Sequence, residues 1–404
     1  MSDTSITKAA EPPAKGGLKP QRSHGWMGLK RGHGAHPIEW LAEKLILLVS
    51  LSAIVMIFLI FIFVGREAWP VITGNTRNAQ SQKVRPVEDL QRMTPLEIQE
   101  YLELTPKMYR EKDRDTLKSL MEVKIEVAGE LPDDKDARVN TTAWRYLLYP
   151  YQWSGYKKPE YIWQPVSPVS KFNLMPLIVG SLKTTLVALL FSVPLALGAA
   201  IYVSQLTHPR LREYLKPAIE MLSGIPSVVA GFFAFIVLAS LLRDLFGYES
   251  RLNALVAGIA LGLAVIPVIF SIAEDALTSV PRQYTQAALA LGASRWQAAW
   301  QVVLPAALPG VFAAIVLGFG RAIGETMIVL MASGNASIMS WNLLDSTRTM
   351  TATIAAELAE TAYGGNHYRI LFLIGILLFI VTFFSNLVAD EVVHRLKRRL
   401  EGKV

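Results

Sequence analysis

Six apolar runs, each about as long as a membrane helix, constrain the fold of this chain more than any other feature. They cover approximately residues 42–64, 174–203, 222–242, 254–273, 304–332 and 369–390. A helix needs roughly 20 mostly apolar residues to cross the hydrocarbon core of a bilayer. Only 18% of the residues are charged and 52% are hydrophobic. The sequence therefore predicts an all-α integral membrane protein with six transmembrane helices.

Basic residues flank the first and the last of these runs. They are Lys8, Lys15, Lys19, Arg22, Lys30 and Arg31 before the first run, and Arg395, Lys397, Arg398, Arg399 and Lys403 after the last. The positive-inside rule puts both termini in the cytoplasm, which agrees with an even number of spans. The net charge of +7 is thus explained by membrane topology, and no nucleic-acid partner is expected.

The topology divides the chain into five regions. We expect a basic cytoplasmic tail at 1–40, a first anchor helix at 41–65, an extracytoplasmic insertion at 66–170, a core at 171–392 with a cytoplasmic segment at 275–303, and a basic tail at 393–404. The insertion has a charged, helical stretch from Thr94 to about Glu122, and an aromatic stretch from Trp144 to Trp163 that suits a membrane interface. Its role is either a structural cap or a docking site for a soluble partner.

The cytoplasmic segment ends in a stretch unlike a lipid-facing helix. Residues 286–305 read QAALALGASRWQAAWQVVLP. Gly292 interrupts the helical pattern, and apolar residues from Trp296 onward recur at three- and four-residue steps. Two short helices around a glycine turn are expected to form a compact knob that docks into a groove on another protein; the alternative is an amphipathic helix resting on the inner leaflet.

This segment resembles the signature of ABC importer permeases, EAA, three residues, Gly, nine residues, then I-x-LP. The matching positions are Gln286, Ala287, Ala288, Gly292, Leu304 and Pro305. The resemblance implies a type I ABC permease core and a coupling helix that sits in a cleft of an ATPase subunit. Gln286 replaces the usual Glu, which puts any salt bridge at that position in doubt. Because the chain has no G-x-x-x-x-G-K-[ST] loop, we expect ATP and Mg to be used by the partner ATPase and no cofactor to be bound here.

Three further stretches are similar to the permeases of phosphate-specific ABC importers, and to the C-type permease rather than its A-type sister. They are residues 222–231, residues 320–335 and residues 349–358. The resemblance covers the first span and about 163–392, and leaves most of the insertion outside. It implies import of inorganic phosphate across the bacterial inner membrane by alternating access. The implied partners are an A-type sister permease, an ATPase dimer and an extracytoplasmic phosphate-binding protein.

The fifth run contains two charges in the stretch GRAIGET. A charged side chain near the bilayer centre costs about 2.5 to 3.5 kcal/mol even on lenient scales. Arg321 and Glu325 are four residues apart, so on a continuous helix they share one face and are expected to pair. Arginine suits phosphate oxygens because it presents a fixed fork of donors. We therefore expect both residues to lie in the substrate pathway; the alternative is a structural pair that ties this span to a neighbour.

A second anion-facing position is expected at the start of the third span. Gly224 and Ser227 flank a proline there, and exposed amides at a helix start attract anions. A plain helix start explains the same residues equally well. Other charges near span ends are most simply interface or end charges: Lys183, Glu220, Glu274 and Asp275.

Other functions remain open at this point. One arginine does not exclude another oxyanion, such as molybdate or sulfate, and a membrane scaffold in phosphate signalling is a further alternative. A membrane enzyme would need Ser223 or Ser227 beside a histidine, but His208, His367 and His394 all lie near span ends. The chain has no cysteine, so thiolate chemistry is excluded. We expect no catalytic residue and no metal site.

Overall fold

The computed structural model describes residues 37–74, 76, 87, 90, 92–102, 104, 106–130, 136, 139–167 and 169–400. Nearly all of the expected tail at 1–40 and the end of the tail at 393–404 lie outside the described residues. The chain divides into two compact units, residues 1–60 and residues 61–404. The second unit contains every element from α2 onward.

The membrane-spanning helices agree closely with the apolar runs. Among the described residues, five helical stretches are long and apolar enough to cross a bilayer, and a bent pair makes a sixth. The five are Trp40–Ile72 of α1 (Pro37–Ile72), Met175–Leu206 containing α6 (Met175–Ile201), Ser227–Phe246 containing α8 (Ser227–Phe233) and α9 (Ala239–Phe246), Ala254–Thr278 forming α10, and Asn366–Arg395 of α17 (Asn366–Leu400). The prediction of an all-α, multi-span membrane fold is confirmed.

The fifth predicted span, 304–332, is not one helix. The stretch Arg295–Ala306 begins with α12 (Arg295–Ala298) and ends with α13 (Leu304–Ala306), and it meets α14 (Leu308–Gly324) at a bend of 74°. Pro309 lies in the first turn of α14, where its missing amide is tolerated. A second break follows Gly324, before the short helix α15 (Met327–Ala332). The helix is therefore interrupted twice within this apolar run, and its composition predicts neither interruption.

Helix α10 is the centre of the second unit. It packs against α6, α14 and α15, while α14 also packs against α17. Small residues allow these close approaches: a Cβ on Gly258 would lie 2.4 Å from Val187, and one on Gly318 would lie 2.6 Å from Ile269. Close packing of this kind stabilises membrane helix pairs, because the hydrophobic effect does not drive helices together inside the lipid.

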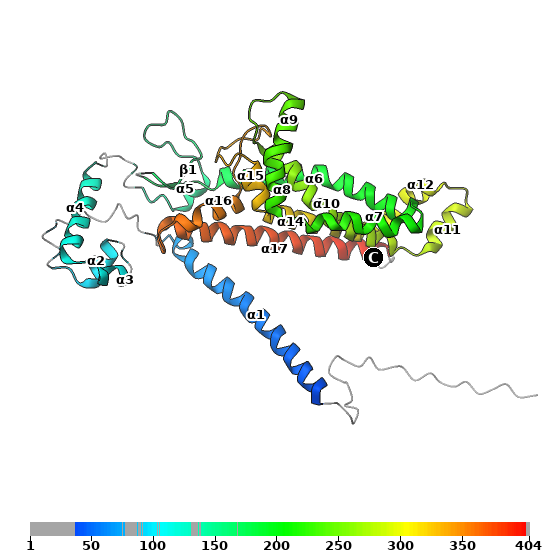
Figure 1. Ribbon diagram of the computed structural model, residues 1–404, viewed down its shortest axis with the longest axis horizontal. Helices are drawn as coiled ribbons and strands as arrows, with labels where there is room; N and C mark the ends of the chain where they lie inside the picture. Colours follow the sequence, from blue (N-terminus) through cyan, green and yellow to red (C-terminus); the bar gives the residue numbers. More distant parts are fainter. Residues whose placement is uncertain are drawn as a thin grey trace, which may run out of the picture. The chain divides into compact units, whose positions relative to one another are not determined.

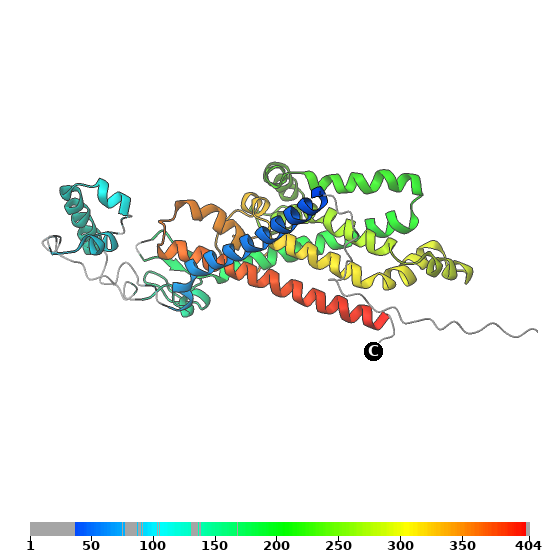
Figure 2. The ribbon, with the colours of Figure 1, turned by 90° about the horizontal axis from the view of Figure 1, so that it is seen from below.

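Short elements gather at the two ends of this helical core (Figures 1 and 2). At one end lie α11 (Arg282–Ala290) and α12, together with an end of α7 (Pro209–Met221). At the other lie α5 (Trp144–Leu148), α16 (Met350–Glu357) and the antiparallel pair β1 (Trp163–Gln164) and β2 (Lys171–Phe172). The residues of the coupling resemblance and the aromatic half of the insertion are therefore at opposite ends of the core.

The insertion contains the helices expected in its charged stretch. They are α2 (Pro95–Tyr101), α3 (Pro106–Glu111) and α4 (Arg114–Glu130). Thr94 begins α2 with a capping box, because its side chain accepts from the amide of Glu97 and the Glu97 side chain accepts in return. Leu90, Ile98 and Met121 belong to a small hydrophobic core formed by residues of the insertion. The helical prediction is confirmed, with α4 continuing to Glu130.

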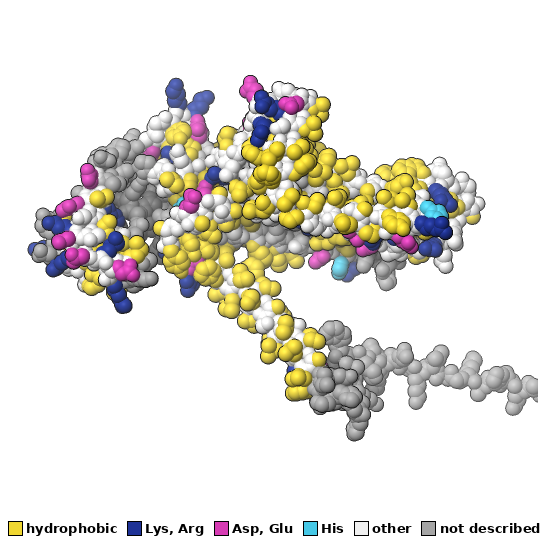
Figure 3. Space-filling model, in the orientation of Figure 1, with side chains coloured by type: hydrophobic (Ala, Val, Ile, Leu, Met, Phe, Trp, Pro, Cys, Tyr) yellow, Lys and Arg dark blue, Asp and Glu magenta, His cyan; other side chains and the backbone are white. Residues whose placement is uncertain are grey.

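Apolar side chains cover the surface where lipid is expected (Figure 3). Helix α1 exposes them along its length, and the third span exposes Phe232, Phe233 and Ile236. In the second unit, the ring centroid of Phe61, in the C-terminal half of α1, lies 4.3 Å from that of Phe379 in α17. Charged side chains are instead concentrated over α2–α4 and at the ends of the core.

Candidate functional site

The two charges that the sequence predicts for the pathway lie at the break between α14 and α15. Arg321 lies in the last turn of α14, roughly 20 Å along the helix from Leu308. Its neighbours Ala322 and Ile323 are buried, but its own side chain is exposed. Among the described residues, no hydrogen bond or ion pair engages its guanidinium. The described part of the chain thus offers no partner to this cation in a spanning segment.

The expected pairing of Arg321 with Glu325 is wrong. Helix α14 ends at Gly324, and Glu325 has an extended backbone, with φ −70° and ψ 134°. The two residues therefore do not share a helix face. Glu325 instead points its Oε1 at the start of α15, where it accepts from the amides of Thr326, at 3.1 Å, and Met327, at 3.2 Å. The carboxylate caps these otherwise unpaired amides, which stabilises the break.

Two other helices hold this break in place. Thr351 of α16 donates from its hydroxyl to the backbone carbonyl of Glu325 at 2.9 Å. The amide of Met350 donates to the Ser181 hydroxyl of α6 at 2.9 Å. Helix α15 packs against α8, where a Cβ on Gly231 would lie 3.1 Å from the carbonyl oxygen of Met327. Helices α8 and α16 therefore meet at the break, and α6 holds α16 in place.

The start of the third span has no side-chain cap. A short 3₁₀ turn (Leu222–Gly224) is followed by Pro226 at the N-cap, and Ser227 is the first residue of α8. Proline at the N-cap has no side-chain acceptor, and Ser227 lies one position inside the helix, so no side chain caps α8. Gly224 is exposed. The first amides of α8 therefore have no side-chain cap, and an anion-facing role for Gly224 and Ser227 stays a prediction.

The segment at 286–305 forms two short helices around a glycine turn, as predicted. Gly292 has a φ of +88°, in the left-handed region that favours glycine. Ser294 starts α12 with a capping box completed by Gln297. The rings of Trp296 and Trp300 stack with centroids 5.8 Å apart, and both are more than half exposed.

The residues of the coupling signature lie on α11, at the glycine turn and on α13 (Leu304–Ala306). Gln286 and Ala287 are exposed on α11, whereas Ala288 is buried. Leu304 and Pro305 lie in α13, where the segment meets the bend before α14. Leu291 beside the turn is 90% exposed. The knob therefore presents apolar surface that this chain does not cover.

Two charges interpreted as interface or end charges are buried instead. Lys183 of α6 is 2% exposed and donates to the carbonyls of Ser340, at 2.9 Å, and Asn342, at 3.0 Å. The side chain of Glu274 of α10 is fully buried and accepts from Arg212 and Lys216 of α7. Both side chains connect distant segments to the core. Their position near the end of a span does not predict these partners.

Arg348 is a partly buried cation that sequence reasoning did not single out. Its Nε donates to the carbonyl and the side-chain oxygen of Asn335, both at 3.0 Å, and its Nη1 binds Glu357. Its position between two threonines in a stretch without other basic residues nearby was the available signal. Arg348 orders the loop that connects α15 with α16.

The described residues offer no support for catalysis or metal binding. They contain no group of three or more His, Asp or Glu residues arranged to hold a metal ion. Ser223 donates to the carbonyl of Glu220 at 2.6 Å. His367 binds the carboxylate of Glu357 at 2.8 Å. Within the described part, neither Ser223 nor Ser227 bonds to a histidine, as nucleophilic activation would require.

Known proteins resemble this chain over the helical core. Residues 173–402 match the family described as the binding-protein-dependent transport system inner membrane component. The chain is 35% identical over 222 residues to the probable ABC transporter permease protein YqgH of Bacillus subtilis, covering 55% of this chain and 72% of that protein. It is 35% identical over 257 residues to the phosphate transport system permease protein PstC of Xylella fastidiosa, covering 59% of this chain and 78% of that protein.

Among solved structures, the inward-facing MetNI methionine ABC transporter aligns with 55% of this chain and 94% of its own, at 18% identity and a TM-score of 0.42. The family match includes the whole of the α14–α15 break and the knob at 286–305, and it excludes α2–α4.

Proposed function

Because the chain belongs to the family of binding-protein-dependent transport system inner membrane components, we propose that it is the permease that moves inorganic phosphate in an ATP-driven importer. Permeases of this family work with a separate ATPase and a substrate-binding protein. The phosphate assignment rests on relatives such as the Xylella fastidiosa PstC, which is named as a phosphate transport permease.

The single observation that carries this function is the exposed guanidinium of Arg321 at the α14–α15 break, which no described residue pairs. A charge in a spanning segment is costly when it faces lipid. The cost falls if the Arg321 side chain faces a polar path between this chain and a partner subunit. Phosphate carries one to two negative charges near neutral pH, and a guanidinium offers it two parallel donors. A single arginine attracts the anion and still permits its release.

In this proposal Glu325 does not pair with Arg321, as its position in the sequence suggests, but has a different role. Its Oε1 is occupied by two amides at the start of α15. These donors partly compensate the negative charge, so repulsion of an incoming anion is reduced. Glu325 therefore shapes the break, and Arg321 contacts the substrate. An anion-facing role for Gly224 and Ser227 at the start of α8 stays a prediction beside this pathway.

The knob at 286–305 is proposed to couple the chain to an ATPase dimer. Its exposed residues include Gln286, Ala287, Leu291 and Trp296. An apolar knob of this size suits a groove on a partner. ATP and Mg would then be used in that ATPase, with an A-type sister permease and an extracytoplasmic phosphate-binding protein completing the complex.

This assignment also sets the orientation. If the knob is cytoplasmic, then α16 and the β1–β2 pair are extracytoplasmic, because they lie at the opposite end of the core. Both termini are then cytoplasmic in the inner membrane, as the basic tails favour. Arg321 lies in the half of the membrane nearer the binding protein.

Uptake by the reconstituted complex tests the function. The chain, its sister permease and the ATPase dimer are placed in liposomes, and the phosphate-binding protein is added outside with labelled phosphate. We expect ATP-dependent uptake that excess unlabelled phosphate abolishes and excess sulfate or molybdate leaves unchanged. Competition by sulfate or molybdate would assign another oxyanion. Assembly without uptake of any of the three would indicate a signalling scaffold.

A further inference from the structure

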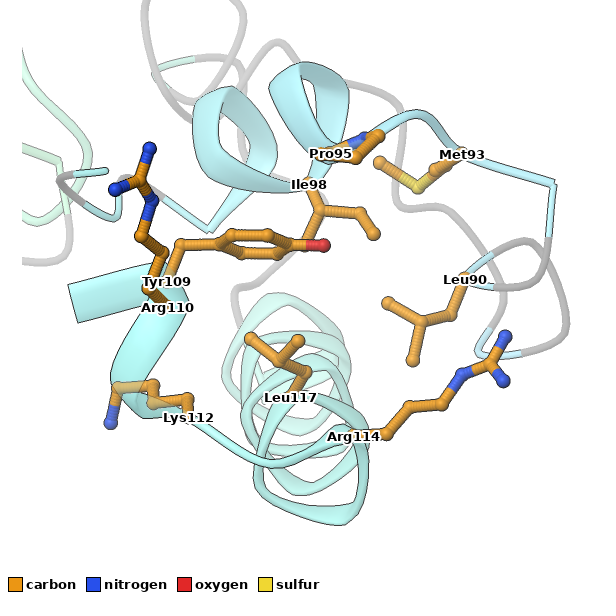
Figure 4. A pocket seen from close by; sticks show the side chains of 9 residues that line it. All are labelled: Leu90, Met93, Pro95, Ile98, Tyr109, Arg110, Lys112, Arg114 and Leu117. Atoms are coloured by element: carbon orange, nitrogen blue, oxygen red, sulfur yellow. The ribbon is translucent and has the colours of Figure 1, made fainter. Parts of the chain in front are cut away.

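A cavity of about 460 Å³ lies in the α2–α4 part of the insertion, outside the residues that match the transport family (Figure 4). Its lining includes the apolar side chains of Leu90, Met93, Ile98 and Leu117, each less than 10% exposed. The ring of Tyr109 lies across the space between Ile98 and Leu117. The volume falls within the range of small-molecule sites.

The cavity also has a cationic edge. Residues 110–115 alternate in charge as Arg, Glu, Lys, Asp, Arg and Asp. Arg110, Lys112 and Arg114 line the cavity, whereas none of the three acidic residues does. In Figure 4, Arg110 and Lys112 lie on one side of the opening and Arg114 lies on the other, beside Leu90. A segment with no net charge therefore contributes only basic residues to the edge of the cavity.

Local structure explains how the acidic and basic residues are separated. Asp113 precedes α4, and its Oδ1 accepts from the backbone amide of Arg114 at 2.7 Å. Acidic residues are favoured at this end of a helix, so Asp113 is held at the helix start. In the described insertion, no ion pair occupies the side chains of Arg110, Lys112 or Arg114. Three cations thus remain available beside an apolar wall.

We propose that this cavity binds a diffusible amphipathic anion, a short apolar chain that carries one carboxylate, sulfonate or phosphate group. The apolar wall removes the chain from water, and the cationic edge binds the head group through charge-assisted hydrogen bonds. An inorganic anion would leave the apolar wall unused. A phospholipid has two long acyl chains that exceed the cavity. The site is independent of the phosphate pathway, because the α14–α15 break shares no residue with it.

Binding of labelled octanoate to the full chain in phosphatidylcholine nanodiscs tests the proposal by equilibrium dialysis, with empty nanodiscs subtracted. The test variant combines Arg110→Gln, Lys112→Gln and Arg114→Gln. The matched control combines Lys118→Gln, Lys157→Gln and Lys158→Gln, which removes the same charge from exposed residues of the insertion that do not line the cavity.

We expect saturable octanoate binding that weakens by about tenfold or more in the test variant and by less than about twofold in the control. Arg110→Lys with Arg114→Lys should retain most of the binding because the charge remains. Octanol and acetate should displace octanoate poorly, since each lacks one half of the recognised chemistry.

Three results would overturn the proposal. The first is an equal loss in the test and control variants, which would mean general electrostatic attraction. The second is displacement by octanol as effective as displacement by unlabelled octanoate. The third is displacement of octanoate by phosphatidylglycerol added to the nanodiscs, which would assign the cavity to a lipid head group. Circular dichroism of each variant confirms that α2–α4 remain folded.

Discussion

The indole Nε1 of Trp163 donates to both carboxylate oxygens of Glu357, at 3.1 and 3.2 Å, although 194 residues separate the two in the chain. The same carboxylate binds Arg348 and the Nε2 of His367. Glu357 therefore joins the strand β1, the loop before α16 and the start of α17. One partly buried carboxylate fixes the end of the core at which the insertion returns.

Trp163→Phe is expected to destabilise the protein by about 1 to 3 kcal/mol, because a hydrogen bond to a charged group is lost. Phenylalanine preserves the aromatic contact with Phe172, whose ring centroid lies 5.9 Å away. Thermal unfolding in detergent measures the change. Trp153→Phe is the matched control, since Trp153 is equally buried. Equal losses for the two variants would show that the indole donor contributes nothing.

Gly180→Ala should disturb the loop that carries Arg348. A Cβ on Gly180 would lie 2.2 Å from the carbonyl oxygen of Arg348 and 2.7 Å from Thr347 Oγ1, so the loop must move. We expect a loss of about 1 to 3 kcal/mol, measured by thermal unfolding. Gly198→Ala on the same helix has open space around the added Cβ within the described structure. It should be neutral or stabilising by about 0.5 to 1 kcal/mol; a loss as large as that of Gly180→Ala would contradict the account.

Leu291→Ser should weaken the association with the ATPase and leave the fold intact. The side chain is 90% exposed beside the Gly292 turn, so its loss costs no packing within this chain. The measurement is the amount of ATPase subunit that co-purifies, with thermal unfolding of the isolated chain beside it. Leu96→Ser, at a 77% exposed leucine of α2, is the control. Unchanged co-purification for Leu291→Ser would remove Leu291 from the proposed interface.

Lys216 should stabilise the protein over all but strongly alkaline pH. It binds Asp275 at 2.7 Å and Glu274 at 2.8 Å. These hydrogen bonds, first to Asp275 and then to Glu274, raise the pKa of Lys216 above its ordinary value of 10.5. The folded state then holds the proton more tightly than the unfolded state. The contribution is complete below pH 10.5 and is lost as pH rises through the raised pKa.

The difference in free energy of unfolding between the wild type and Lys216→Gln measures this contribution. It should be constant between about pH 7 and pH 9 and shrink above the ordinary lysine pKa. Lys118→Gln, at an exposed lysine of α4, should show no such trend. A difference that persists unchanged at strongly alkaline pH would mean that the Lys216 charge is not what stabilises the contact.

Membrane thickness explains why most spans could be predicted from sequence. The bilayer requires about 20 apolar residues for each crossing, so the runs at 174–203 and 254–273 end close to where α6 and α10 end. The fifth run differs because both of its breaks lie within apolar sequence. The break after Gly324 depends on the Glu325 carboxylate that caps α15, a contact that hydropathy does not record.

The sequence singles out the residues of the candidate site but does not predict how they are arranged. Arg321 and Glu325 are conspicuous because they are charges in an apolar run, yet their pairing depended on a helix that ends between them. Lys183 is equally conspicuous, but its partners Ser340 and Asn342 follow it by more than 150 residues. Partners of this kind are chosen by tertiary packing, which no local pattern encodes.

Phosphate uptake by Arg321→Gln tests the central claim most directly. The reconstituted complex with this variant should assemble normally and take up phosphate about tenfold or more slowly than the wild type. Arg321→Lys, which keeps the charge without the fork, should fall between them. Arg243→Gln, at an exposed arginine of α9, should match the wild type. Uptake at the wild-type rate by a normally assembled Arg321→Gln complex would contradict a phosphate pathway at the α14–α15 break.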